Sequence, residues 1–360
     1  MASIEQLLQK QENKKRILAS LRRTGKQTRR ELTRALSLSW ACVFELSAEL
    51  IDEGLLAEEK GCATAAKGRV PTRLGLSADR FFLGLDVNRI GIHACLCTLA
   101  EEKRESETFS IDVTSAEALE SSIIAAAERF FRAYGDRILG IGVAMQGIFD
   151  RRADVWHFPG AKQTLELSPK TFLEQQFSVP VAVGHDPDCI ALSLLTNEDT
   201  RDLMVVRVDE GVGLSVRQGG AFFEGGPLEL GYTVVDASGR RLGMCVTRHA
   251  IERSTGISMD RLINSPALAK EHAEWFFEIG QELGRAVGNL SNLLSAQRIV
   301  FCGEVMRLSQ DLMAGVIQGY EAAAVPKFRA ELCVSEITDA AYGAMRLMAE
   351  SYSAFGGKRR

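Results

Sequence analysis

The sequence contains no run of apolar residues that approaches the ~20 needed to cross a bilayer. Its first 18 residues, MASIEQLLQKQENKKRIL, carry scattered charges and lack the apolar segment of a secretory signal peptide. We therefore expect no membrane insertion and no secretion, and predict a cytoplasmic protein. The eight cysteines are dispersed and lack the paired spacing of a disulfide framework, so we expect reduced thiols.

The charge of the chain is unevenly distributed. Its 360 residues suffice for two to three domains at ~150 residues each, and 46% hydrophobic with 25% charged residues is an ordinary globular composition. Residues 1–80 hold 15 Lys/Arg and 10 Asp/Glu, a net +5, whereas the remainder holds 28 and 37, a net −9. A basic module on an acidic body favours a polyanion partner, although a solvated basic helix gives the same charge.

Apolar spacing and caps predict three helices in residues 1–54. Thr28 and Glu31 have the spacing of a capping box, which begins the second helix, and Ser39 is placed to cap the third. Two helices across a short turn form a helix-turn-helix. The residues expected to face the core recur at helical spacing: Ile17, Leu18, Leu21, Val43, Leu46 and Leu50.

Two short strands predicted at 55–59 and 70–74 surround a basic loop and form a wing. We therefore assign residues 1–76 to a winged helix-turn-helix domain that binds double-stranded DNA. Cations on the second helix and the wing are placed to meet the phosphate backbone. The predicted phosphate contacts are Lys26, Arg29, Arg30, Arg34, Lys60, Lys67, Arg69 and Arg73.

The third helix has few side chains suited to reading bases. Ser39, Trp40, Phe44 and Glu45 are expected to face the major groove, without an arginine or lysine for guanine or an amide for adenine. Glu45 can accept a hydrogen bond from cytosine, and Trp40 or Phe44 can touch a thymine methyl group. In the alternative, the two aromatic residues pack against a partner subunit and Glu45 is solvated.

Strands alternating with helices after Arg80 predict an α/β body, with ligands at the carboxyl ends of the strands. We assign 80–185 plus 337–360 to a first lobe and 186–336 to a second, and read 101–107 as a charged turn. The predicted strands are 81–86, 90–99, 138–144, 179–183, 203–208, 214–217 and 298–302, and the predicted helices are 115–134, 188–196, 245–255, 268–295 and 337–350.

These segments together resemble the ROK family (repressors, open reading frames and sugar kinases). The resemblance is carried by 28–39 (TRRELTRALSLS), 68–74 (GRVPTRL), 83–86 (LGLD), 140–148 (GIGVAMQGI) and 229–231 (ELG). It implies a two-lobed actin-like (ribonuclease H-like) sugar-kinase fold, and the repressor branch adds an N-terminal winged helix. For function it implies a homodimeric or homotetrameric transcriptional repressor that binds operator DNA and senses a sugar or sugar derivative.

The resemblance also implies two ATP phosphate loops, and both are altered here. The first, of Asp-x-Gly-x-Thr type, reads DVNRI at 86–90 and lacks the glycine and the threonine. The second reads DEGVGLS at 209–215 and places two carboxylates where phosphate oxygens would lie, which disfavours an anion. We expect no ATP binding, no cofactor and no enzymatic activity. The alternative is a sugar kinase that uses Asp186 as its base.

For the sugar site, the resemblance implies five effector-binding residues. Asp186 matches the catalytic base of the kinases, and Glu229 and Tyr232 match a Glu-x-Gly-His motif with tyrosine in place of histidine. Asp186 or Asp188 could instead cap the helix that follows. The five predicted effector-binding residues are His157, His185, Asp186, Glu229 and Tyr232.

The family's zinc site has lost its donors in this sequence. Its four ligand positions fall on Tyr232, Leu242, Met244 and His249. Leucine cannot coordinate, and a thioether is a poor zinc ligand. Cys245 and His249 could form half a site, but we expect no metal and a packing role.

Overall fold

Two units make up the chain in the computed structural model, which describes residues 4–60, 72–150, 153–195, 202–223 and 228–352. The first unit joins Met1–His185 to Ala341–Arg360, and the second is Asp186–Ala340. Among the helices in the described ranges, none has the length and apolar character of a membrane span.

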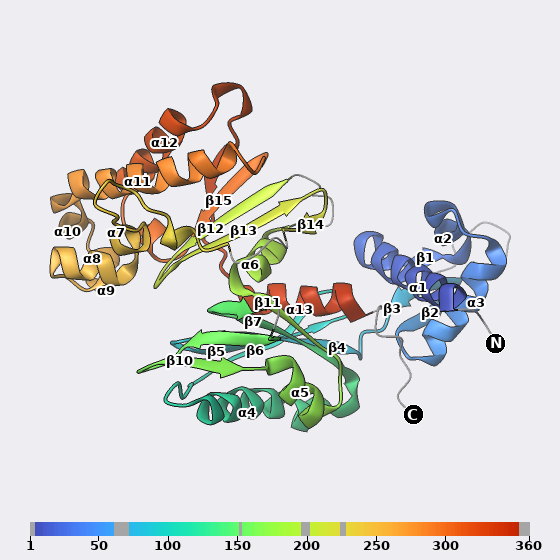
Figure 1. Ribbon diagram of the computed structural model, residues 1–360. Helices are drawn as coiled ribbons and strands as arrows, with labels where there is room; N and C mark the ends of the chain where they lie inside the picture. Colours follow the sequence, from blue (N-terminus) through green and yellow to red (C-terminus); the bar gives the residue numbers. More distant parts are fainter. Residues whose placement is uncertain (1–3, 61–71, 151–152, 196–201, 224–227, 353–360) are drawn as a thin grey trace. The chain divides into compact units, whose positions relative to one another are not determined.

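The N-terminal head is a winged helix, as predicted (Figure 1). Thr28 Oγ1 accepts a hydrogen bond from the Glu31 N–H, while the Glu31 carboxylate accepts one from the Thr28 N–H and its pKa is lowered as a result. The strands pair antiparallel in the order β1-β3-β2. The elements are α1 (Ile4–Thr24), β1 (Gln27–Thr28), α2 (Arg29–Leu36), α3 (Trp40–Asp52), β2 (Leu56–Lys60) and β3 (Thr72–Leu76).

The first unit's body is built on a five-stranded sheet in the order β11-β7-β4-β5-β6. Along β4, alternate side chains face opposite sides: Leu83 and Leu85 meet the core under α4, whereas Phe82 packs toward α13. A small sheet, β10-β9-β8, completes this unit. The elements are β4 (Phe81–Asn88), β5 (Gly91–Thr98), β6 (Lys103–Phe109), α4 (Ala116–Tyr134), η1 (Gly135–Arg137), β7 (Ile138–Met145), β8 (Ile148–Asp150), β9 (Val155–Pro159), β10 (Thr164–Leu167), α5 (Pro169–Phe177), β11 (Val181–His185) and α13 (Ala340–Ser351).

Two glycines let helix α13 lie directly on this sheet. A Cβ on Gly84 would stand 1.9 Å from the Ala341 carbonyl oxygen, and one on Gly142 would stand 1.8 Å from that of Ala344. Both distances are far inside van der Waals contact. Glycine at these positions is therefore what permits the helix to approach the strands.

The head packs on the same face of the five-stranded sheet as α13 does. Its core residues continue into one buried cluster with Phe82 and Met345. At the edge of this cluster the Arg22 guanidinium of α1 lies 3.2 Å from the Glu101 carboxylate, and Arg346 of α13 approaches the same carboxylate at 3.1 Å. Burial lowers the pKa of Arg22, which is the cost of placing this charge at the junction. The three side chains join head, sheet and last helix.

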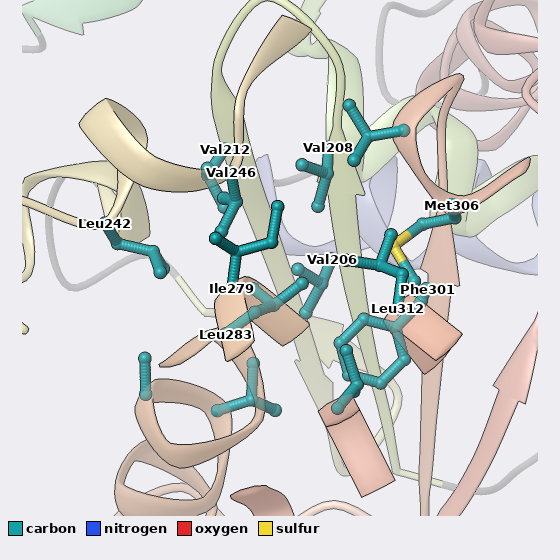
Figure 2. Close-up of a cluster of buried hydrophobic side chains, with 14 of the residues drawn as sticks. Val206, Val208, Val212, Leu242, Val246, Ile279, Leu283, Phe301, Met306 and Leu312 are labelled. Atoms are coloured by element: carbon teal, nitrogen blue, oxygen red, sulfur yellow. The ribbon is translucent and has the colours of Figure 1, made fainter. Parts of the chain in front are cut away.

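The second unit is built on a sheet in the order β14-β13-β12-β15-β16. Figure 2 shows its core, where Val206, Leu283 and Phe301 are fully buried. Helices α11 and α12 pack closely, because a Cβ on Gly284 would stand 2.1 Å from the Val316 carbonyl oxygen. The elements are α6 (Asp186–Leu194), β12 (Leu203–Val208), β13 (Val212–Gln218), β14 (Ala221–Phe222), η2 (Leu230–Tyr232), α7 (Gly243–Val246), α8 (Arg248–Thr255), α9 (Met259–Asn264), α10 (Pro266–Glu271), α11 (Ala273–Ser291), β15 (Arg298–Cys302), η3 (Val305–Arg307), α12 (Gln310–Ala323), η4 (Pro326–Phe328) and β16 (Glu331–Val334).

Several local expectations were wrong. The charged turn expected at 101–107 is mostly strand β6, which pairs with β5 at the sheet edge, where charged side chains can reach water. The helix expected at 245–255 is broken at Thr247, whose hydroxyl caps α8. That expected at 268–295 is broken at His272. The turn expected at 185–188 already belongs to α6 from Asp186 onward.

Candidate functional site

The outward side of α3 carries two large exposed aromatic residues. Ser39 caps the helix by accepting a hydrogen bond from the Cys42 N–H at 3.2 Å. Trp40 is 51% exposed and Phe44, one turn later, is 53% exposed. Large apolar side chains that are half exposed on neighbouring turns are typical of a binding face.

The acidic edge of α3 is paired with lysines of α1. Lys10 Nζ lies 3.0 Å from Glu45 and 2.5 Å from Glu49. Lys14 Nζ lies 2.8 Å from Glu49 and 2.7 Å from Glu53. Partial burial raises the pKa of Glu49, but the hydrogen bonds from the two lysines leave it lowered. Two lysines of the head thus offset part of the negative charge of these three carboxylates.

Arg29 makes its contacts within the head. Its Nε donates to Ser47 Oγ at 2.9 Å, its Nη2 donates to Glu58 at 2.7 Å, and its guanidinium lies 5.2 Å from the centre of the Phe44 ring. These contacts tie α2 to α3 and β2.

The other predicted phosphate contacts fall in two groups. Arg30 and Arg34 are exposed on α2, and Arg73 on β3 is also exposed. Lys67 and Arg69 lie outside the described residues. Among the cations that the structure describes, the exposed arginines of α2 are the closest to α3 in the sequence.

In the second unit, Asp186 is held by an arginine of the neighbouring strand. Asp186 opens α6, and its Oδ2 accepts a hydrogen bond from Arg207 Nη1 of β12 at 2.5 Å. Arg207 Nε donates to Asp209 at 2.6 Å. The three side chains are only 10–19% exposed. The guanidinium already binds one oxygen of Asp186, so a hydroxyl group of a substrate would have to share this carboxylate with Arg207.

A second arginine, Arg248, lies at the second expected phosphate loop, residues 209–215. Arg248 donates to Glu304 at 2.8 Å and lies 3.9 Å from Glu210. Its backbone N–H donates to the Asp209 carbonyl oxygen at 2.8 Å. Asp209, Glu210 and Glu304 together crowd this position with carboxylates, whose counter-ions are arginines of the same chain. Because like charges repel, these carboxylates disfavour a triphosphate at this position.

The other phosphate motif, in the first unit, is a self-contained turn. The Asn88 side-chain oxygen accepts hydrogen bonds from the backbone N–H groups of Ile90 at 2.9 Å and Gly91 at 3.2 Å. The N–H of Arg89 donates to the side chain of Gln146 at 3.1 Å. Backbone donors that could approach a phosphate are thus bound by the protein's own amides, so this loop does not fit ATP either.

The residues at the expected zinc positions do not form a donor set. Leu242 is buried in the apolar core, and Met244 is exposed. Cys245 is buried and its thiol donates to the Arg241 carbonyl oxygen, whereas His249 is exposed on α8. Burial, together with the neighbouring Glu282, raises the pKa of Cys245 to about 11. Leucine offers no donor atom and a thioether is a poor zinc ligand, so the side chains at these positions do not fit the metal.

This raised pKa predicts slow alkylation of Cys245 in the folded protein. At pH 8 the thiol stays protonated and buried, so iodoacetamide should modify the half-exposed Cys42 well before it. Cys245 labelling should accelerate about tenfold per pH unit toward pH 11, as the thiolate fraction grows. Peptide mapping by mass spectrometry measures both rates. Equal labelling of the two cysteines at pH 8 would contradict the buried thiol.

The five predicted effector residues divide between the two units. His157 lies on β9, with Nδ1 3.8 Å from the Glu166 carboxylate of β10, and is not on a loop. His185 ends β11, with its ring 6.3 Å from that of Trp156. In the second unit, Tyr232 is exposed beneath the Arg241 guanidinium, and its N–H donates to the Glu229 carbonyl oxygen at 3.0 Å. Asp186 is the fifth.

Sequence reasoning missed Arg207 and Arg248. Arg207 stands inside the apolar strand LMVVRV. A charged residue in such a run is seldom buried unless it is paired, so its place in this strand already indicated a buried ion pair. Arg248 showed only an ordinary i,i+4 pair with Glu252 in the sequence, because its other partners Glu210 and Glu304 come from distant segments.

Comparison with known proteins agrees with this architecture. The model of the ROK family matches residues 82–350. The DNA-binding transcriptional dual regulator NagC of Escherichia coli (strain K12) is 23% identical, over 91% of this chain and 89% of its own length. The crystal structure of a ROK family transcriptional regulator, a homolog of the E. coli MLC protein, has a TM-score of 0.81 at 19% identity and covers 96% of both chains.

A ROK family glucokinase from Streptomyces griseus, solved with glucose and AMPPNP, has a TM-score of 0.60 at 16% identity and covers 74% of this chain and 98% of its own. At these identities the structural likenesses show the fold, and they confirm the predicted winged helix with a two-lobed actin-like body. The family model covers most of the sequence. The chain belongs to the ROK family.

Proposed function

We propose that this chain is a transcriptional regulator, in the simplest case a repressor, whose winged helix binds operator DNA. The observation that carries the proposal is the head itself: α3 presents an exposed face, and α2 beside it carries the exposed Arg30 and Arg34. A net charge of +5 over residues 1–80 favours the DNA backbone. The full-length likeness to NagC, a transcriptional regulator, supports the same function.

We further propose that the body senses a sugar or a sugar derivative through His157, His185, Asp186, Glu229 and Tyr232. A protein 23% identical to this chain is named N-acetylglucosamine repressor, which supports this ligand class. Such a ligand alters DNA binding only if its affinity differs between two conformations of the protein. A homodimer or homotetramer suits the two-fold symmetry of typical operators.

A sugar kinase with Asp186 as base is the competing function. The likeness to a glucokinase and the retained aspartate favour it. Three features oppose it: Asn88 closes the first loop, Arg207 holds Asp186, and Arg248 with its carboxylates fills the second loop. We therefore assign no phosphotransfer to this chain. ATP turnover on a hexose panel that Asp186→Asn abolishes would establish the kinase instead.

Reversing the charge of α2 should abolish tight DNA binding. The purified protein is expected to shift DNA from its own promoter region at moderate salt. The double variant Arg30→Glu/Arg34→Glu should bind at least about tenfold more weakly, and its log K against log salt slope should fall by about two, one for each lost phosphate contact. Gel shift and fluorescence anisotropy across a salt series measure these effects.

The matched control is the double reversal Arg132→Glu/Arg253→Glu, at exposed arginines of α4 and α8 in the body, which changes the net charge by the same amount. It should leave both affinity and slope unchanged. N-acetylglucosamine added to the same assay tests effector release. If the unmodified protein shifts no promoter DNA, the proposed function is wrong.

A further inference from the structure

We propose that α3 recognises thymine through the 5-methyl group, by apolar contact with Trp40 and Phe44, in place of hydrogen bonds to base edges. This inference rests on the proposed function, since it requires that the head bind duplex DNA. It names the chemical feature of the operator that the helix reads.

The exposed side of α3 is largely apolar. Trp40, Phe44 and Ala48 recur at intervals of four residues and share one side of the helix, with Ala41 beside them. Trp40 and Phe44 are the two large exposed side chains of this group. The helix sequence, WACVFELSAELID, contains no arginine, lysine, asparagine or glutamine. The side chains that make bidentate contacts with guanine or adenine are therefore lacking from α3.

The remaining polar side chain on this side of α3 that could contact a base, that of Glu45, already forms an ion pair within the head. Glu45 is the exposed carboxylate that could accept a hydrogen bond from cytosine. Its Oε1 accepts one from Lys10 Nζ of α1 at 3.0 Å, and Lys10 also binds Glu49. Contact with a cytosine amino group would have to compete with this ion pair. The pair also reduces the negative charge next to Phe44 that would repel DNA.

Phe44 is held in place before any partner binds. The Arg29 guanidinium lies over its ring at 5.2 Å and is itself anchored to Ser47 and Glu58. An aromatic ring fixed in this way loses little freedom on binding, which favours its use as a reader.

The charge around the strip selects DNA as its occupant. Arg30 and Arg34 are exposed on the preceding helix, and Arg73 is exposed on β3. Within the major groove of DNA, the methyl group of thymine is the apolar feature that a side chain can contact. An apolar strip on a head that also exposes these arginines therefore matches a groove lined with thymine methyl groups between two phosphate strands.

The test removes the methyl group and nothing else. Footprinting on the chain's own promoter defines the bound site, and synthetic duplexes then carry 2′-deoxyuridine in place of single thymines. The affinity, measured by fluorescence anisotropy at fixed salt, should fall about fourfold at each contacted position, the effect of burying one methylene-sized group. Replacing thymines outside the footprint should have no effect.

Two variants connect the effect to the residues. Phe44→Ala and Trp40→Ala should bind thymine and uracil duplexes equally at the position that each residue contacts. Phe328→Ala, a change at an exposed aromatic residue of the body, should keep the full preference for thymine. Both α3 side chains are half exposed, so the variants are expected to fold, and an unchanged melting temperature checks this.

The outcomes separate the two proposals. If no promoter DNA is bound, the proposed function is wrong and this inference falls with it. If DNA is bound but uracil substitution has no effect at any position, only the methyl recognition is wrong. The same holds if Phe44→Ala weakens self-association and leaves the thymine preference intact, because the strip would then be a protein interface.

Discussion

Replacing Gly142 by valine is expected to unfold the first unit under conditions in which the unmodified protein is stable. A Cβ alone would stand 1.8 Å from the Ala344 carbonyl oxygen and 3.0 Å from the Met345 nitrogen. These are backbone atoms of α13, so no side chain can rotate away, and the helix must leave the sheet. Overpacking commonly costs 1–3 kcal/mol, and we expect more than about 4 kcal/mol here because a whole helix is displaced.

The matched comparison uses alanine at both positions, Gly142→Ala and Gly211→Ala, because alanine adds only a Cβ. At Gly211 an added Cβ meets no atom of the described residues within 4 Å. Gly211→Ala should therefore stay within about 0.5 kcal/mol of the unmodified protein, whereas Gly142→Ala should already lose about 3 kcal/mol. Urea unfolding followed by circular dichroism measures both. A Gly142→Ala variant as stable as Gly211→Ala would show that α13 does not lie on β7 as described.

Removing the charge of Arg207 should destabilise the second unit nearly as strongly. Arg207→Met keeps much of the side-chain volume but leaves the carboxylates of Asp186 and Asp209 without the guanidinium that binds both. Breaking a buried pair by removing one partner costs about 3–5 kcal/mol, and the partial exposure of these groups places the expected loss near about 3 kcal/mol. Thermal and chemical unfolding provide the measurement.

The double variant Arg207→Met/Asp186→Asn identifies the source of this loss. With one carboxylate neutralised, part of the stability should return, and the double-mutant cycle should show a coupling energy above about 1 kcal/mol. Arg253→Met, at an exposed arginine of α8, is the control and should change stability by less than about 0.5 kcal/mol. Additive effects of Arg207→Met and Asp186→Asn would rule out their direct pairing.

Local signals predicted the head well. The capping box at Thr28, the cap at Ser39 and the apolar spacing of Val43, Leu46 and Leu50 all act within a few residues, so the sequence alone displays them. The edge strand β6 was missed because its charges resemble a turn until its partner β5 is known. Helix α12 was missed as well, since its tight packing on α11 depends on glycines in both helices.

The site was harder to predict, because its important contacts join distant segments. Arg29 was expected to contact phosphate, and nothing near it in the sequence announces Glu58, 29 residues later. Lys10 and Glu45 are 35 residues apart. Charge counts and helical faces are visible in a sequence, but whether a given charge is free or neutralised depends on the tertiary structure.

The support of the head comes from both ends of the polypeptide. Arg22 of α1 and Arg346 of α13 bind the same carboxylate of Glu101, and α13 lies directly on Gly84 and Gly142. During synthesis on the ribosome the head therefore emerges first, but its base is completed only after nearly the whole chain has been translated. A product truncated before residue 340 lacks α13, so its head should be less stable than that of the longer chain.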